Sequence, residues 1–168
     1  AATISQEAVL RLLTHPQEAV ELRIEARRYP AVARNIVARK RAPGADQRVV
    51  LCAHFDTKIN TPGATDNGAS VAALLTLAEK IAGRDWPFDL EFIAFNGEEY
   101  LPIGDDEYLR RAGETLDQIL LAINMDGCGS TLGTTSIAVF STTEEFESQM
   151  DQLILKYPGV VKVEPWPE

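Results

Sequence analysis

The chain has 168 residues, of which 45% are hydrophobic and 24% charged, and its formal net charge is −9. This length and composition are ordinary for one globular domain with a sizeable core. The negative charge predicts a surface that repels nucleic acid and anionic membranes. No apolar stretch is long enough to span a bilayer. We therefore expect no nucleic-acid partner and no membrane insertion, while the cellular compartment stays open.

The first third of the chain contains one helical pattern and three strand patterns. Residues 5–13 place apolar side chains at helical spacing. Residues 20–27 alternate apolar and polar side chains, which is typical of a half-buried strand. Residues 33–38 and 48–53 are also expected to be strands, separated by turn residues at 42–46. We expect these three strands to form an antiparallel edge of a sheet.

Helices and strands alternate in the remainder of the chain. Apolar spacing predicts helices, at residues 68–81, 105–112 and 143–157. Apolar runs predict strands, at residues 89–95, 119–125, 136–140 and 160–163. Asp66 or Asn67 can cap the first of these helices, and Leu153 is expected to face inward from the last. The alternation predicts an α/β fold whose sheet is covered by helices on both faces.

Candidate ligands follow the ends of three apolar strands. His54 follows residues 51–53, the pair Glu98 and Glu99 comes soon after residues 92–95, and Asp126 follows residues 122–125. Ligand sites of open α/β sheets lie beyond the carboxyl ends of the strands, so parallel strands would bring these side chains together. A single carboxylate in a loop usually lies at the surface, exposed to solvent. These residues are candidates only because they share a position after the ends of strands.

These side chains form a ligand set for zinc or a related divalent ion. Four carboxylates would repel one another at the rim of the sheet: Asp66, Glu98, Glu99 and Asp126. Two divalent cations would cancel this charge, and Asp66 at a helix entry could bridge ions about 3.5–4 Å apart. Asp56 is expected to orient the ring of His54 from a second layer of contacts. One glutamate of the pair would bind metal while its neighbour acts as general base on water.

The two cysteines, Cys52 and Cys128, are too few for a disulfide scaffold, and no C-x-x-C motif is present. We interpret them as small buried side chains. The sequence leaves open whether they pair with each other.

Four motifs in series carry a family resemblance: His54-Phe55-Asp56 and residues 63–68, 95–99 and 124–126. In order and spacing, residues 49–126 resemble the co-catalytic zinc aminopeptidases. That family is in turn similar to the glutamate carboxypeptidases, the glutaminyl cyclases and the transferrin-receptor ectodomain. The resemblance implies a mixed, largely parallel central sheet sandwiched between helices, with peptide substrates and two zinc ions in a complete domain.

The same resemblance implies a role for each site residue. His54, Asp66 and Asp126 would hold one zinc ion. Asp66 and Glu99 would hold the other, with Glu98 as the general base. The family pattern adds a further histidine from a later loop as a ligand of the second zinc ion.

That further histidine is absent from these residues, since the only other histidine is His15. We interpret His15 as a surface residue before Pro16, because short connections would have to carry it across the sheet. The expectation is a single partial peptidase domain over residues 1–168 that lacks its C-terminal part, with one zinc ion or none. Residues 3–13, within a segment 1–15, resemble the tail of the protease-associated domain that some family members insert.

The leading interpretation is a metallo-exopeptidase that removes N-terminal residues from peptides, inactive or impaired in this chain. One alternative is a glutaminyl cyclase-like transferase with a single zinc ion. Another is a non-catalytic, receptor-like module of the same fold. The run Asp66-Asn67-Gly68 and a complete ligand set for the first metal favour the peptidase. Side-chain preference and oligomeric state stay open.

Overall fold

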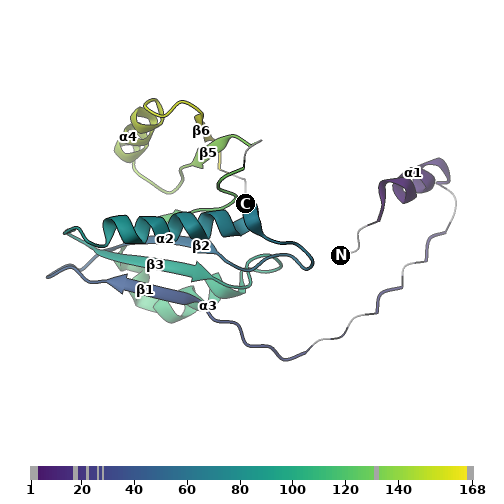
Figure 1. The fold of residues 1–168 in the computed structure, drawn as a ribbon, viewed down its shortest axis with the longest axis horizontal. Helices are drawn as coiled ribbons and strands as arrows, with labels where there is room; N and C mark the ends of the chain where they lie inside the picture. Colours follow the sequence, from purple (N-terminus) through teal and green to yellow (C-terminus); the bar gives the residue numbers. More distant parts are fainter. Residues whose placement is uncertain are drawn as a thin grey trace. The chain divides into compact units, whose positions relative to one another are not determined.

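The computed structural model describes residues 4–16, 19–21, 23–25, 27, 29–130 and 133–165. The chain divides into two units, Ala1–Val32 and Ala33–Glu168. Helix α1 (Gln6–Thr14) belongs to the first unit, and the sheets with the remaining helices belong to the second (Figure 1). None of the helices in the described residues has the length and apolar character needed to cross a bilayer.

The first unit confirms one expected element and contradicts another. Helix α1 lies where the apolar spacing predicted it, and the Ser5 hydroxyl caps it by accepting a hydrogen bond from the Ala8 amide. The strand predicted over residues 20–27 is wrong for the described part of that segment, which contains no strand. Val20 and Ile24 are 65% and 62% exposed. Alternating apolar and polar side chains form a stable strand only where a neighbouring strand pairs with the segment and a core buries its apolar side. Leu22 and Ala26 lie outside the described residues.

The main sheet confirms the predicted mixed, largely parallel topology. Its strands are β1 (Ile36–Lys40), β2 (Arg48–His54), β3 (Asp89–Phe95) and β4 (Ile119–Asn124). In the order β1-β3-β2-β4, β2 is parallel to both β3 and β4, and β1 is antiparallel to β3. All seven residues of β2 are buried, as is typical of a central strand of a parallel sheet.

The expected antiparallel edge is therefore only partly correct. Strand β1 is antiparallel at an edge of the sheet, but it pairs with β3 and not with β2. Strand β2 is buried along its whole length and lies between β3 and β4, so it has no free edge for β1. Four of the five β1 residues are exposed, which suits an edge strand.

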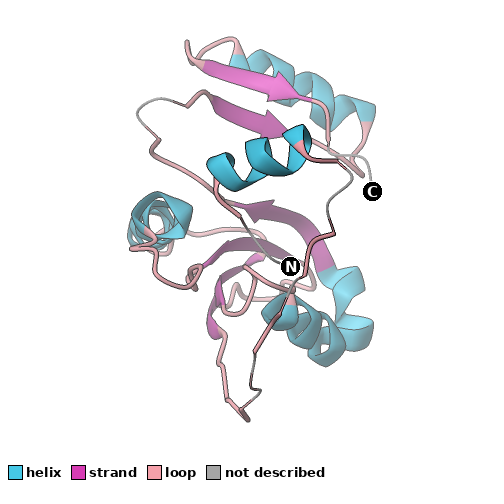
Figure 2. Ribbon diagram, turned by 90° about the vertical axis from the view of Figure 1, so that its right-hand side faces the viewer, coloured by secondary structure: helices cyan, strands magenta, loops and turns pink. Residues whose placement is uncertain are grey.

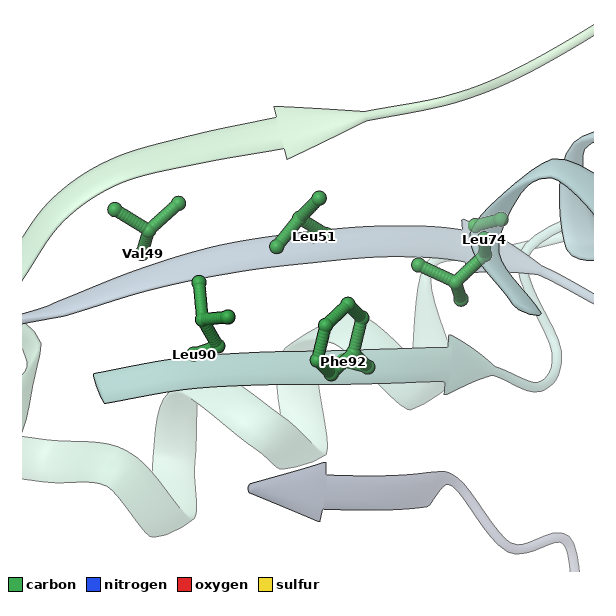
Figure 3. Close-up of a cluster of buried hydrophobic side chains, with 6 residues drawn as sticks. Val49, Leu51, Leu74, Leu90 and Phe92 are labelled. Atoms are coloured by element: carbon green, nitrogen blue, oxygen red, sulfur yellow. The ribbon is translucent and has the colours of Figure 1, made fainter. Parts of the chain in front are cut away.

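Helices cover both faces of this sheet, as predicted (Figure 2). Helix α2 (Ala69–Ile81) packs Leu74 against Val49, Leu51, Leu90 and Phe92 (Figure 3). On the opposite face, Tyr108 of α3 (Ile103–Ala112) packs against a second cluster, made of Val50, Cys52, Ile93 and Phe95. The clusters come from alternate residues of the same strands, because successive side chains of a strand point to opposite faces.

One acidic side chain is fully buried in the sheet. Glu91 of β3 is 0% exposed, and its carboxylate accepts a 2.8 Å hydrogen bond from the Tyr108 hydroxyl. Arg39 of β1 and Arg48 of β2 pair with the same carboxylate. These partners offset the cost of burying the charge and link β1, β2 and α3 to the middle of β3.

The later elements form a smaller parallel pair, β5 (Thr135–Ala138) and β6 (Val160–Val163), joined through α4 (Glu144–Ile154). A turn of 3-10 helix, η2 (Gly113–Gln118), follows α3. Thr143 caps α4 by accepting a hydrogen bond from the Phe146 amide. The expected inward position of Leu153 is wrong, because this side chain is 42% exposed. Helix α4 buries no residue fully, so its apolar side is only partly covered in the described chain.

Candidate metal centre

The parallel strands bring the predicted ligands to one edge of the main sheet. His54 is the last residue of β2, and Asp126 follows the end of β4 by two residues. Glu98 and Glu99 lie in the loop after β3. Asp66 lies in η1 (Ala64–Gly68), a short turn whose backbone is not helical at Asp66 and Asn67 and which leads directly into α2. Because β2, β3 and β4 run the same way, the loops after them meet beyond their carboxyl ends.

Three ligand atoms form a compact group. The Nε2 atom of His54 lies 3.2 Å from Asp66 Oδ1 and 3.5 Å from Asp126 Oδ1. Ligand atoms of these three residues all lie within 4.8 Å of one another. His54 is buried, whereas both carboxylates are about half exposed at 54% and 49%. One imidazole nitrogen and two carboxylate oxygens, open to solvent on one side, fit the three-ligand pattern of catalytic zinc sites.

The ring of His54 is oriented by the loop that follows it. Its Nδ1 atom lies 3.2 Å from the backbone carbonyl oxygen of Asp56 and 3.7 Å from the Asp56 carboxylate. A proton on Nδ1 donated to this carbonyl leaves Nε2 free to bind a metal ion. The main-chain oxygen of Asp56 is thus the nearer partner of the ring, although the sequence pointed to its carboxylate.

The Asp56 carboxylate instead holds the glutamate loop. It accepts hydrogen bonds of 3.1 and 3.2 Å from the backbone amides of Glu98 and Glu99. Burial tends to raise the pKa of Asp56, but these amide hydrogen bonds outweigh it and hold the pKa below its ordinary value. The loops after β2 and β3 are thereby tied together.

Glu98 faces the three-ligand group. Its Oε2 atom lies 3.7 Å from His54 Nε2. Burial raises the pKa of Glu98 above its ordinary value, and the charges of Asp126 and Glu99 raise it further, although His54 opposes them. Burial tends to lower the pKa of His54, but the carboxylates of Asp126 and Glu98 raise it overall. Three carboxylates thus surround the His54 ring, an arrangement that favours positive charge at the centre of the group.

Glu99 has a different partner from its neighbour. Its carboxylate is 5% exposed and lies 3.2 Å from the ammonium nitrogen of Lys58. This contact is the largest cause of a raised pKa of Lys58. A pocket of about 290 Å³ opens beside these two residues, lined by Lys58, Thr61, Pro62, Gly63, Ala64, Thr65, Asp66 and Glu99. The sequence reasoning missed Lys58, for which the only signal was a basic residue between His54 and Asp66.

Asn67 ties the helix entry to the loop after β4. It is completely buried, its side-chain amide donates a 3.0 Å hydrogen bond to the Met125 carbonyl, and its oxygen accepts from the Gly127 amide. The prediction that Asp66 or Asn67 caps α2 is wrong, since Gly68 precedes α2 without a side-chain cap. The hydrogen bonds of Asn67 instead hold Asp66 and Asp126 in adjacent loops.

The other candidates have simpler surroundings. Both cysteines are free, with Cys52 buried and Cys128 half buried, so the burial expectation is correct for Cys52 only. Burial raises the pKa of Cys52 to about 12. His15 is exposed, as expected, and its Nδ1 atom lies 3.0 Å from the Arg11 carbonyl oxygen within the first unit.

The sequence model of peptidase family M28 matches residues 35–167. The chain belongs to this family. The match contains the main sheet, the candidate ligands and the loops that carry them, whereas residues 1–34 lie outside it. The role of residues 1–15 as the tail of an inserted domain stays a prediction.

Several known proteins are similar to part of the chain. The alkaline phosphatase isozyme conversion protein of Escherichia coli is 29% identical over 97 residues, 49% of this chain and 28% of its own length. Aminopeptidase YwaD of Bacillus subtilis is 30% identical over 83 residues, 49% of this chain and 18% of its own length. A probable lipoprotein aminopeptidase of Mycobacterium tuberculosis is 32% identical over 96 residues, which make up 56% of this chain and 19% of its own length. The chain thus spans less than a third of these relatives.

Solved structures confirm the predicted fold. A zinc aminopeptidase from Bacillus subtilis superposes with a TM-score of 0.68 at 22% identity, covering 77% of this chain and 34% of its own. An aminopeptidase from Aneurinibacillus sp. strain AM-1 also has a TM-score of 0.68 at 21% identity, and the superposition covers 79% of this chain and 34% of that protein. At this identity the superposition establishes the architecture alone.

Proposed function

We propose that this chain carries the zinc-binding and proton-transfer residues of an aminopeptidase. The observation that carries the proposal is the group formed by His54, Asp66 and Asp126, open to solvent at the carboxyl ends of parallel strands. Membership of a peptidase family supports peptide bonds as the substrate class. Relatives named as aminopeptidases support removal of N-terminal residues.

In this proposal the three residues of the group hold the first zinc ion. Bound zinc supplies Lewis-acid polarisation of the scissile carbonyl and lowers the pKa of water. Glu98 lies at the edge of the group and accepts the proton of the attacking water, then returns it to the leaving amine. Its raised pKa suits that role, because a general base works best when its pKa approaches the working pH.

The charge of the site also suits a substrate with a free amino terminus. The carboxylates of Glu98, Asp126 and Asp66 are about half exposed and lie around one imidazole. An α-ammonium group is attracted to such a cluster, whereas a terminal carboxylate is repelled. The charge of the site therefore supports an aminopeptidase over a carboxypeptidase.

We further infer that these 168 residues provide one complete metal position and part of a second. Asp66 as a bridge and Glu99 as a terminal ligand would contribute to the second position. The sequence contains only one histidine besides His54, namely His15. Zinc sites usually have at least three protein ligands, so the 168-residue chain should bind one zinc ion and show little or no turnover.

The test combines calorimetry on metal-stripped protein with an aminoacyl-nitroanilide assay. One tight zinc equivalent that disappears in His54→Ala, without turnover, is the expected result. Absence of zinc binding would overturn the proposal. Two tight equivalents with turnover would show that another residue completes the site. Ammonia release from an N-terminal glutaminyl peptide without peptide cleavage would favour the cyclase alternative.

A further inference from the structure

We propose that Lys58 is the resident second cation of this site, so that its ammonium group occupies the place at Glu99 where a second metal ion would bind. The inference rests on the proposed function, since it assumes a metal ion at the group of His54, Asp66 and Asp126. It assigns a role to a residue outside the predicted ligand set.

Lys58 forms an ion pair with Glu99. The Glu99 side chain is 5% exposed and the Lys58 side chain 59%, and their charged atoms are 3.2 Å apart. A lysine therefore reaches from the surface to an almost buried carboxylate. A buried carboxylate is costly unless it is paired, and Lys58 supplies the pairing charge.

The backbone around Lys58 holds it opposite Glu99. The Lys58 carbonyl oxygen accepts hydrogen bonds from the Thr61 hydroxyl, at 2.7 Å, and from the Thr61 amide, at 3.1 Å. The amide of Ile59 donates a 2.9 Å hydrogen bond to the hydroxyl of Tyr100, the residue after Glu99. The loop of Lys58 is thus tied to the loop of Glu99 independently of the ion pair.

The remaining ligands form a separate group. The three ligand atoms within 4.8 Å of one another belong to His54, Asp66 and Asp126, and Glu99 is not among them. Its neighbour Glu98 faces His54 instead. The described chain thus offers a three-ligand position for a divalent ion beside a lysine–carboxylate pair.

A second divalent ion and the Lys58 ammonium group exclude each other. Both would bind the Glu99 carboxylate, and two positive groups a few ångströms apart repel strongly in a partly desolvated site. Because Lys58 also lines the 290 Å³ pocket next to Asp66, it would remain close to a metal ion bridged there. Loading of a second metal ion therefore requires Lys58 to leave.

The experiment measures zinc binding to the metal-stripped 168-residue chain by calorimetry, with Co²⁺ absorption spectra as a second readout. The variants are Lys58→Met, which removes the charge, and Lys58→Arg, which keeps it. Lys162→Met is the matched control, because Lys162 also pairs with carboxylates, those of Glu147 and Asp151, in the later part of the chain.

We expect one tight zinc equivalent in the wild-type chain and a weak second one. Lys58→Met should bind the second ion about three- to tenfold more tightly, as loss of a competing ion pair predicts, without a change at the first position. Lys58→Arg and Lys162→Met should behave as the wild type does. The Co²⁺ spectrum should gain a second component at lower metal concentration only in Lys58→Met.

Equal affinity for the second ion in the wild-type chain and in Lys58→Met would overturn the inference alone. Two tight equivalents in the wild-type chain would overturn it as well, and would also contradict the single zinc ion expected of this chain. Both results leave the first zinc position intact. Absence of any zinc binding in the wild-type chain would overturn the proposed function and this inference together.

Discussion

Glu98 and Glu99 are adjacent in the sequence, yet their carboxylates have different surroundings. Glu98 lies 3.7 Å from the His54 ring and is 42% exposed, whereas Glu99 is almost buried against Lys58. Both backbone amides donate to Asp56, which holds the pair in place. A half-exposed carboxylate whose pKa is raised by partial burial and by acidic neighbours suits proton transfer, whereas a buried and paired carboxylate suits cation binding.

The first prediction concerns Glu98→Gln in a form of the protein that shows turnover. Loss of the general base should lower kcat by about 10²–10⁴-fold, with zinc content nearly unchanged. Steady-state kinetics and metal analysis of the purified variant measure both effects. Glu107→Gln, which alters a carboxylate of α3 paired with Arg110 and Arg111, is the control and should leave both unchanged. Loss of a full zinc equivalent in Glu98→Gln would mean that the two glutamates have exchanged roles.

The second prediction concerns the cysteines. Burial raises the pKa of Cys52 to about 12, so its thiol stays protonated near neutral pH. Cys128 is only half buried. In the native protein, a disulfide reagent should label Cys128 much faster than Cys52, and urea should abolish the difference. Variants with a single cysteine assign each rate, and equal native rates would contradict the burial of Cys52.

At the scale of elements, side chains link the loops of the site to one another. Asp56 connects the loop after β2 to the loop after β3, and Asn67 connects the entry of α2 to the loop after β4. Asn35, just before β1, accepts a hydrogen bond from the Asn96 amide and donates one to the Gly104 carbonyl in the first turn of α3. The candidate ligands are therefore held by a network of side-chain to backbone contacts.

The third prediction tests the contact between α3 and this network. A β-carbon at Gly104 would lie 2.4 Å from the Asn96 carbonyl oxygen and 2.6 Å from the Asn35 side-chain oxygen. Gly104→Ala should therefore lower the free energy of unfolding by about 1–3 kcal/mol, as overpacking does. Gly83→Ala is the matched control, because nothing lies within 4 Å of a β-carbon there. Urea denaturation measures both variants, and equal stabilities would contradict the close approach.

At the scale of the whole molecule, the metal position joins segments that are distant in sequence. His54 comes from β2, Asp66 from the entry of α2, and Asp126 from the loop after β4. Without a cation, carboxylates at this position repel one another. Bound zinc would therefore link the elements of the main sheet and relieve that repulsion.

The fourth prediction follows from this linkage. Zinc that binds only the native state should raise the free energy of unfolding, by about 2.7 kcal/mol at a concentration 100 times its Kd. Thermal unfolding of metal-stripped protein with and without zinc measures the effect. His54→Ala should abolish it, and His15→Ala, which removes the exposed histidine of the first unit, should retain it. Equal loss in both variants would show that zinc acts away from the proposed site.

The sequence by itself determined the type and place of most elements of the second unit. Strands β2 and β3 and helix α2 were predictable because apolar runs and helical spacing indicate, from neighbouring residues alone, which side chains are buried. The same runs placed His54 and Asp126 after strand ends. The prediction of a strand over residues 20–27 was wrong because it also relied on a local pattern. An alternating pattern favours a strand, but the strand forms only where a neighbouring strand pairs with it.

Only the tertiary structure decided which partners these residues have. The pairing of β1 with β3, the hydrogen bonds of Asn67 to the loop after β4, and the contact between Lys58 and Glu99 join residues 41 to 60 positions apart. No local pattern encodes such contacts, since they depend on strand order and on how the loops fold over the edge of the sheet. The sequence therefore supplied the candidate ligands, and the fold selected which of them face one another.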